Sequence, residues 1–109
     1  MDTEGKTRLE RNIGLCMAAG GVTVGFDLIL KEVRSKNAKF VLLASDASQR
    51  TKKQITDKCS FYGIRCFLPD LASGDVSKAV GKHCSCVAAA FTGKGPWQTV
   101  MDALDNQEK

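Results

Sequence analysis

Three charged side chains follow a glycine at helical spacing in the segment Gly25–Arg34. Asp27, Lys31 and Arg34 stand at i, i+4 and i+7, so on a helix they share one face. The amino end of such a helix offers free N–H groups to a phosphate, and the two cations add positive charge. Asp27 can accept from a guanine amino group, as carboxylates accept from other base-edge donors. The alternative is a solvated helix face on which Asp27 and Lys31 form a surface pair worth about 0.2–0.5 kcal/mol, and composition alone favours it.

The polar turn Asp46–Ser48 is the second part of this candidate site, and a βαβ unit positions it. Phe40–Ser45 is almost wholly apolar, which is typical of a strand buried on both faces. A helical pattern follows the turn and ends at Gly63, and Ile64–Leu68 resumes as a second apolar run. These two strands should be parallel, and open α/β sheets bind ligands outside the carboxyl ends of such strands. The buried stripe of the helix is predicted to be Ile55, Cys59 and Tyr62.

Two further motifs contain the residue types of a ligand site. His83, Cys84 and Cys86 place three potential zinc ligands within four residues, but Cys-x-Cys lacks the usual gap and no second ligand pair follows at a credible distance. Thr92–Pro96 is a glycine-rich turn between a strand and a helix, yet it matches neither the Walker pattern nor G-x-G-x-x-G. A turn that demands positive φ explains its two glycines without a ligand. We therefore expect no metal and no cofactor.

No group of residues forms a catalytic constellation. The single histidine has no nucleophile–acid pair arranged around it in the sequence. Cys16, Cys59 and Cys66 fall on apolar faces, where thiols are core residues rather than nucleophiles. The aromatic fraction of 6% gives no sign of a base-stacking platform, and we expect Phe91 and Trp97 in the core. These features predict a protein that is not an enzyme.

The remaining pattern alternates helices with short strands. A helix capped by Thr7 precedes the strand Val22–Val24, and a second helix follows that strand. After the βαβ unit, a short helix over Asp75–Val80 leads to a small-residue apolar strand over Val87–Phe91, which is expected to lie centrally in the sheet. The last helix follows the glycine-rich turn. This order predicts an α/β fold, a three-layer α/β/α sandwich with a small mixed sheet.

Length and composition bound the class of protein. The 109 residues, of which 43% are hydrophobic and 26% charged, fit one globular domain over 1–109 with an ordered core of about 7–104. No apolar run approaches the roughly 20 residues that cross a bilayer, and the first residues lack the apolar stretch of a secretory signal. The five cysteines are then expected as thiols in a reducing compartment, which predicts a cytoplasmic protein. The formal charge of +4 permits an anionic partner without requiring one.

Several motifs match one known family in order along the chain. The most specific are GFDLILKEVR, residues 25–34, and AKFVLLASDASQRTKKQITDKCSFYGI, residues 38–64. The opening Gly14–Gly21 and then Gly25 echo the pattern GLA-x-x-AGK-x-x-x-G, and VSKAVGK, residues 76–82, follows before the last strand. From roughly Leu9 to Leu104 the chain thus resembles the kink-turn RNA-binding ribosomal-protein family, whose large-subunit members are called seven-Ae and thirty-e. Within it, the bacterial YlxQ-like branch is the most similar.

The resemblance implies a sandwich without catalytic activity that binds kinked RNA helices at tandem sheared G·A pairs. In that family the contacts come from the turn into the second helix, an exposed lysine on that helix, the Asp-containing turn after the buried strand, and the loop before the last strand. Carried over to this sequence, these contacts fall on Gly25, Asp27, Lys31, Asp46, Lys82, His83, Cys84 and Ser85. Charge geometry adds, as groups that position the RNA backbone, Arg34, Arg50 and Lys52.

Two positions depart from the family's pattern. Leu28 stands where better-studied members carry the base-reading glutamate of Gly-x-Asn-Glu, and Gly21 stands where a lysine follows Ala-Gly. The resemblance as a whole gives the first hypothesis: a ribosome-associated monomer that binds kink-turn or ribosomal RNA, with ribosomal proteins as further partners and no membrane contact. The alternative is a protein-interaction module on the same fold with an eroded RNA surface, for which an exposed Phe26 or Leu28 would be the natural contact.

Overall fold

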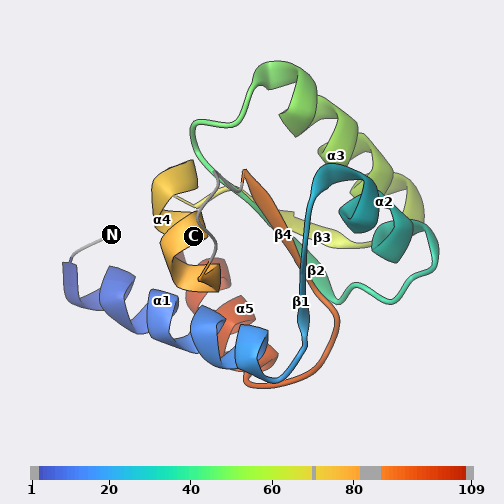
Figure 1. Ribbon diagram of the computed structural model, residues 1–109. Helices are drawn as coiled ribbons and strands as arrows, with labels where there is room; N and C mark the ends of the chain where they lie inside the picture. The colour runs from blue at the N-terminus through green and yellow to red at the C-terminus, as the bar shows by residue number, and fades with distance from the viewer. Residues whose placement is uncertain (1–2, 70, 82–86, 108–109) are drawn as a thin grey trace.

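A four-stranded sheet lies between two layers of helices in the computed structural model of this chain (Figure 1). The structure describes residues 3–69, 71–81 and 87–107. Along these residues the elements are α1 (Thr3–Ala18), β1 (Val22–Val24), α2 (Phe26–Arg34), β2 (Phe40–Leu43), α3 (Gln49–Tyr62), β3 (Arg65–Phe67), α4 (Ser73–Val80), β4 (Ala88–Phe91) and α5 (Trp97–Gln107).

The strand directions bring three strand ends to one edge of the sheet. The order is β1-β4-β2-β3; β4 runs antiparallel to both β1 and β2, and β2 runs parallel to β3. Val24 and Leu42 pair with Ala89 from its two sides, so β1 and β2 point the same way. The carboxyl ends of β1, β2 and β3 therefore share an edge with the amino end of β4. The predictions of a mixed sheet, a parallel β2–β3 pair and a central β4 are confirmed.

Each face of the sheet has its own hydrophobic cluster. Along β2, Phe40 and Leu42 belong to a cluster with α1, α4 and α5, whereas Val41 and Leu43 belong to a cluster with α2 and α3. This alternation follows from the period of two in a strand. All four residues are fully buried, because helices cover both faces (Figure 1). The predicted three-layer α/β/α sandwich is confirmed.

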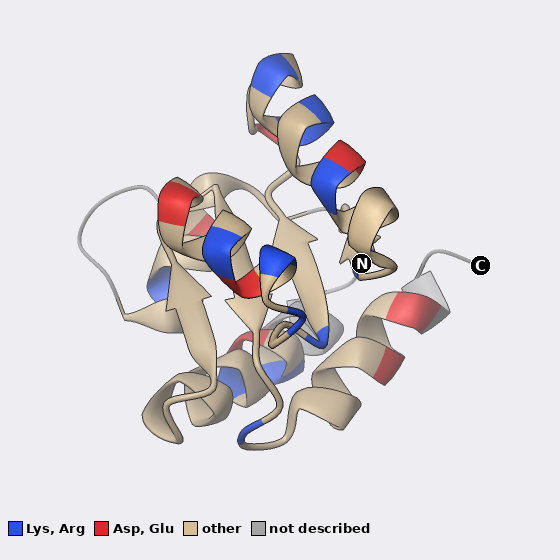
Figure 2. Cartoon of the chain, turned by 90° about the vertical axis from the view of Figure 1, so that its right-hand side faces the viewer, with Lys and Arg blue, Asp and Glu red and all other residues tan. Residues whose placement is uncertain are grey.

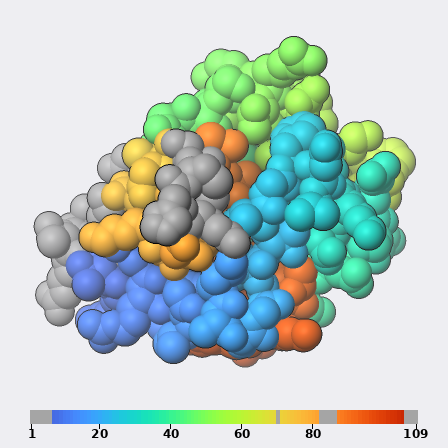
Figure 3. Space-filling view, in the orientation of Figure 1, coloured from blue at the N-terminus to red at the C-terminus, as the bar shows by residue number. Residues whose placement is uncertain are grey.

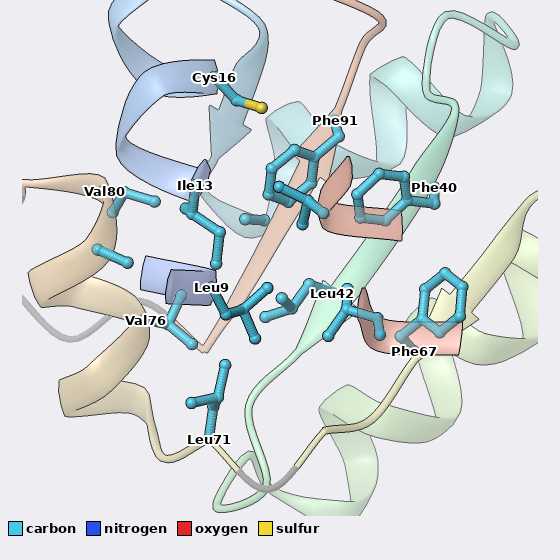
Figure 4. Close-up of a cluster of buried hydrophobic side chains, with 14 of the residues drawn as sticks. Leu9, Ile13, Cys16, Phe40, Leu42, Phe67, Leu71, Val76, Val80 and Phe91 are labelled. Carbon is cyan, nitrogen blue, oxygen red and sulfur yellow. The ribbon is translucent and has the colours of Figure 1, made fainter. Parts of the chain in front are cut away.

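Stacked aromatic rings fill the centre of the larger cluster. Phe40 and Phe91 are register partners on β2 and β4, and their rings stack with centroids 4.4 Å apart. Phe67 contacts Phe40 edge-on at 5.7 Å. Trp97 packs partly buried against the same cluster, as predicted for a core residue. Figure 4 shows the aliphatic side chains around these rings: Leu9, Ile13, Leu42, Leu71, Val76 and Val80.

The helix starts differ from two of the predictions. The cap at Thr7 is wrong, because α1 begins at Thr3 and continues through Thr7. The Thr-x-x-Glu spacing of a capping box is also compatible with a helix interior. Helix α4 begins at Ser73 instead of Asp75. The strands β2, β3 and β4 are each one or two residues shorter than their apolar runs, a difference common at element ends.

The glycine-rich turn after β4 is shaped by backbone conformation and close packing. Gly93 and Gly95 have φ of 101° and 74°, which L side chains rarely adopt. A Cβ on Gly95 would lie 2.9 Å from Cα of Cys16, and a Cβ on Gly21 would lie 2.9 Å from Cβ of Lys94. The turn thus packs against the end of α1. The prediction that both glycines serve a positive-φ turn is confirmed.

Candidate nucleic-acid interface

Two predicted parts of the site lie at the same edge of the sheet. Strand β1 passes into Gly25 and α2, and β2 passes into the turn Asp46–Ser48 and α3. These two strand ends flank the amino end of β4, at the top of the sheet in Figure 1. Since Val24 and Leu42 sit on either side of Ala89, about two strand spacings, roughly 10 Å, separate them. The edge is therefore compact enough for one ligand to contact both turns.

Gly25 gives α2 an open amino end. Its φ of 101° and ψ of 129° require glycine, although a Cβ would meet nothing closer than Cδ1 of Leu28 at 3.8 Å. No side chain caps the helix here. The first N–H groups of α2 have no intrahelical acceptor, so they and the helix dipole favour an anion at this point.

Cationic side chains follow this open helix end. Lys31 and Arg34 lie in the last turn of α2 and Asp27 in its first turn, and all three are exposed. Within the described part of the chain, none of these three side chains makes a hydrogen bond or ion pair, so the alternative, an Asp27–Lys31 surface pair, is not formed. Arg50, at the start of α3, is likewise exposed and without such a partner among the described residues. These groups are available to a ligand.

Asp46 and Lys52 hold the β2–α3 turn in place. Both carboxylate oxygens of Asp46 accept hydrogen bonds from Ser73, one from its main-chain N–H at 2.8 Å and one from its hydroxyl at 2.9 Å. The Lys52 Nζ donates to the carbonyl oxygen of Ser45 at 2.8 Å. Ser48 caps α3 by accepting from the N–H of Thr51 at 3.1 Å. The turn is thus fixed by its own side chains. Direct contact of Asp46 and Lys52 with RNA stays a prediction.

The net positive charge is confined to one stretch of the chain. Residues 26–62 hold eight Lys and Arg against four Asp and Glu, whereas the rest of the chain holds eight of each. The whole formal excess of +4 therefore lies between the start of α2 and the end of α3. Figure 2 shows Lys and Arg positions along both of these helices on the face turned toward the viewer. A polyanion would find its attraction on this side of the molecule.

Part of the predicted site falls outside the described residues. Lys82, His83, Cys84 and Ser85 belong to this part, as does Cys86, the third potential zinc ligand. Elsewhere, over 3–69, 71–81 and 87–107, no three His, Cys, Asp or Glu side chains are grouped to hold a metal ion. The same ranges contain no helix with the length and apolarity to cross a membrane.

Comparison with known proteins assigns the chain to a family. Residues 7–100 match the family described as ribosomal protein L7Ae/L30e/S12e/Gadd45. The chain belongs to this L7Ae family. RNA-binding protein YlxQ of Bacillus subtilis (strain 168) is 36% identical over 93 residues, 85% of this chain and 91% of that protein. RNA-binding protein YlxQ of Enterococcus faecium is 39% identical over 70 residues, 64% of this chain and 67% of that protein. The predicted YlxQ-like branch is confirmed.

Solved structures agree with the L7Ae fold. A protein of unknown function from Bacillus halodurans C superposes with a TM-score of 0.82 at 26% identity, covering 90% of this chain and 97% of that one. The Giardia lamblia 15.5kD RNA binding protein superposes with a TM-score of 0.78, covering 99% of this chain and 91% of that one. At 17% identity the second match shows the fold alone.

The two departures from the L7Ae-family pattern have different structural settings. Gly21 is buried, and a side chain there would run into the carbonyl oxygen and Cβ of Lys94, so the turn after β4 excludes the family's lysine. Leu28 is 56% exposed beside Asp27 on the first turn of α2. An apolar side chain thus lies within the candidate interface itself.

The exposure of one aromatic residue was not predicted from the sequence. Phe61, in the last turn of α3, is 80% exposed. The predicted stripe of Ile55, Cys59 and Tyr62 is correct for the first two, which are buried, and Tyr62 is half-buried. Phe61 falls off that stripe by helical spacing, and this offset was the available signal for an aromatic side chain on the surface.

The described thiols are core residues with opposite electrostatic settings. Cys16 and Cys59 are buried and Cys66 is half-buried, as the apolar faces predicted. Burial raises the pKa of the Cys16 thiol above its ordinary value. A hydrogen bond with Cys66 lowers the pKa of Cys59 and outweighs the opposing effect of burial. None of the three lies at the sheet edge that carries the candidate interface.

Proposed function

We propose that this chain is a non-catalytic RNA-binding protein whose RNA site is the sheet edge at the ends of β1 and β2. One observation carries the proposal: the open start of α2 and the fixed β2–α3 turn flank the same strand end, and the whole formal excess of +4 lies in the segment that contains them. The L7Ae-family membership and the printed description of the YlxQ relatives as RNA-binding proteins support it.

The proposed RNA is sharply bent, of the kink-turn type, with tandem sheared G·A pairs. Lys31, Arg34 and Arg50 neutralise phosphates, and the N–H groups at the start of α2 bind a phosphate or a base edge. Asp27 accepts from a guanine amino group, which a sheared pair exposes and Gly25 lets approach closely. Lys82, His83, Cys84 and Ser85 complete the site by family resemblance. The proposal includes a cytoplasmic, ribosome-associated monomer.

Asp46 and Lys52 have a positioning role in this proposal. Their side chains end on Ser73 and on the Ser45 carbonyl, so they fix the turn against which the RNA backbone lies. Removing them should change affinity through the shape of the turn and not through loss of a single phosphate contact.

Fluorescence anisotropy with two labelled RNAs tests the proposal. One RNA contains a kink-turn, and the other is a fully paired duplex of matched length and charge. At physiological salt we expect binding of the kink-turn at or below about micromolar concentration and at least about tenfold weaker binding of the duplex. In Asp27→Ala, the kink-turn should lose affinity while the duplex does not. Equal affinities of the native protein for both RNAs, or equal losses on both in the variant, contradict the proposed recognition.

The alternative is a protein-interaction module on the same fold, and one observation favours it. Leu28 and Phe26, on the first turn of α2, are 56% and 37% exposed at the point where the RNA is proposed to bind. A folded native protein that binds neither RNA in the same titration would support this alternative over the RNA proposal.

A further inference from the structure

A groove between α2 and α3 forms an apolar surface outside the sheet edge. It has a volume of about 410 Å³ and is lined by Phe26, Leu30, Gln54, Asp57, Lys58 and Phe61. The lining side chains recur at i and i+4 on α2 and at i, i+3, i+4 and i+7 on α3, so one face of each helix forms a wall. An exposed apolar groove with a polar rim is typical of a protein-interaction site.

The outer wall of this groove is held in place by the core. The ring of Phe61 contacts the ring of Tyr62 edge-on, with centroids 4.9 Å apart. Tyr62 in turn packs against the cluster that contains Ile55 and Cys59. Phe61 is 80% exposed, yet it is supported from below by an anchored ring. An exposed ring that already packs on a neighbouring ring loses less conformational entropy when a partner covers it than a ring without such a contact.

The charges around the groove indicate which kind of partner fits. Helix α3 carries four basic side chains, Arg50, Lys52, Lys53 and Lys58, against the single acidic residue Asp57. Lys58 lines the groove next to Phe61, so carboxylates of a partner would find a complementary charge there. Asp57 lines the groove as well and would repel carboxylate and phosphate alike, so the acidic residues of a partner fit over Lys58 while its apolar side chain fits inside the groove. The apolar walls thus suit an apolar side chain, which a protein segment provides, and the basic excess of α3 suits acidic residues beside that side chain.

We propose that the α2–α3 groove docks a segment of a partner protein that presents an aromatic or aliphatic side chain flanked by acidic residues. The apolar side chain lies between Phe26 and Phe61, and the acidic residues contact Lys58 and the other cations of α3. The inference goes beyond the proposed RNA binding and does not depend on it. The groove shares the start of α2 with the proposed RNA site, and the cations of α3 include Arg50, which that proposal assigns to a phosphate.

Selection of peptides against the full-length protein tests this docking site. A display library of random peptides is selected on the native chain, and an enriched peptide is then synthesised and titrated by fluorescence anisotropy. We expect enriched peptides to have a net negative charge and at least one aromatic or large aliphatic residue. Phe61→Ala and Lys58→Glu should each reduce the affinity for the synthetic peptide by about tenfold or more. Both positions are exposed, so circular dichroism should show an unchanged fold for both variants.

A matched control lies on the other helical layer. Leu15 is 52% exposed on α1, and Figure 3 shows α1 at the bottom of the surface and α3 at its top. Leu15→Ala should leave peptide affinity unchanged. The inference is overturned if no peptide is enriched, if enriched peptides carry a basic excess, or if they bind Phe61→Ala as tightly as the native chain.

Two further readouts identify other occupants of the groove. Sedimentation of the native chain as a dimer, with Phe61→Ala as a monomer, would assign the groove to a second copy and overturn the inference. A loss of kink-turn RNA affinity in Phe61→Ala as large as the loss of peptide affinity would assign the groove to RNA, with the same consequence. Peptide binding and RNA binding are measured separately, so failure of one proposal is distinguishable from failure of the other.

Discussion

The carboxylate of Asp46 accepts two hydrogen bonds from Ser73, one from the main-chain N–H and one from the hydroxyl. The two residues lie 27 positions apart, and their contact joins the β2–α3 turn to the first turn of α4. Asp46 therefore provides α4 with an acceptor at its amino end, where a negative charge is also favoured by the helix dipole. The same contact sets the position of the turn that we assign to the RNA site.

Removing the Asp46 carboxylate should lower both stability and RNA affinity. We expect Asp46→Ala to reduce the free energy of unfolding by about 1–2 kcal/mol, because two charge-assisted hydrogen bonds at an exposed position are lost. Ser73→Ala should cost less, since the main-chain N–H still donates. Urea denaturation of both single variants and the double variant checks the coupling. Strictly additive losses would mean that the Ser73 hydroxyl and the Asp46 carboxylate are not energetically coupled.

Substitution of Gly25 should strain the start of α2. Gly25→Ala forces an L residue into a φ of 101°, so we expect a loss of about 1–3 kcal/mol of stability and weaker RNA binding. Gly74→Ala is the matched control, because a Cβ there meets nothing within 4 Å and φ is not positive. The control should keep or slightly raise stability. Equal thermal midpoints for the two variants would contradict the assigned backbone requirement.

Lys31 should contribute to RNA affinity through one phosphate. In Lys31→Ala, the slope of log affinity against log salt concentration should flatten by about 0.7–0.9, and affinity should fall on bent and straight RNA alike. Lys94→Ala is the control, since Lys94 follows the carboxyl end of β4 at the opposite edge of the sheet. Anisotropy titrations at several salt concentrations measure both slopes. A slope in Lys31→Ala equal to that of the native chain removes this residue from the interface.

The buried thiols should make stability depend on alkaline pH in opposite directions. Because burial raises the pKa of Cys16, its contribution is complete below the ordinary thiol pKa of about 8.5 and is lost as pH rises above it. The pKa of Cys59 is lowered, so its contribution grows as pH rises toward the ordinary value. Cys16→Ala should therefore flatten the loss of stability above neutral pH, and Cys59→Ala should steepen it. Urea midpoints measured between neutral and alkaline pH test this difference. Parallel pH profiles for both variants would refute the opposite contributions of the two thiols.

The fold was predictable wherever a local pattern had one interpretation. The run Phe40–Ser45 predicted a strand covered on both faces, and β2 is fully buried. Gly63 predicted the end of α3, where φ is 73°. Short alternating elements then left few topologies, and the family resemblance selected one. Such features are set within a few residues of chain, so the sequence alone is informative about them.

Features that depend on distant residues were not predictable. The first residue of α4, Ser73, donates to Asp46, which belongs to another part of the chain. The sequence identified Asp46 and Lys52 as candidate RNA contacts but could not show that each has an intramolecular acceptor or donor. Phe61 was missed for a different reason: helical spacing places it off the predicted stripe, but the prediction followed only the residues on that stripe. The convergence of Gly25 and Asp46 followed only from the order and direction of the strands.

Amide chemical-shift mapping with kink-turn RNA tests the proposed interface most directly. Uniformly 15N-labelled protein is titrated with the kink-turn RNA, and shift changes are assigned along the chain. We predict that the largest changes fall on residues 25–31 and 45–50, at the edge where β1 and β2 end, with little change at 93–95 on the opposite edge. Largest changes at 93–95, or changes spread evenly over the surface, would contradict RNA binding at this edge of the sheet.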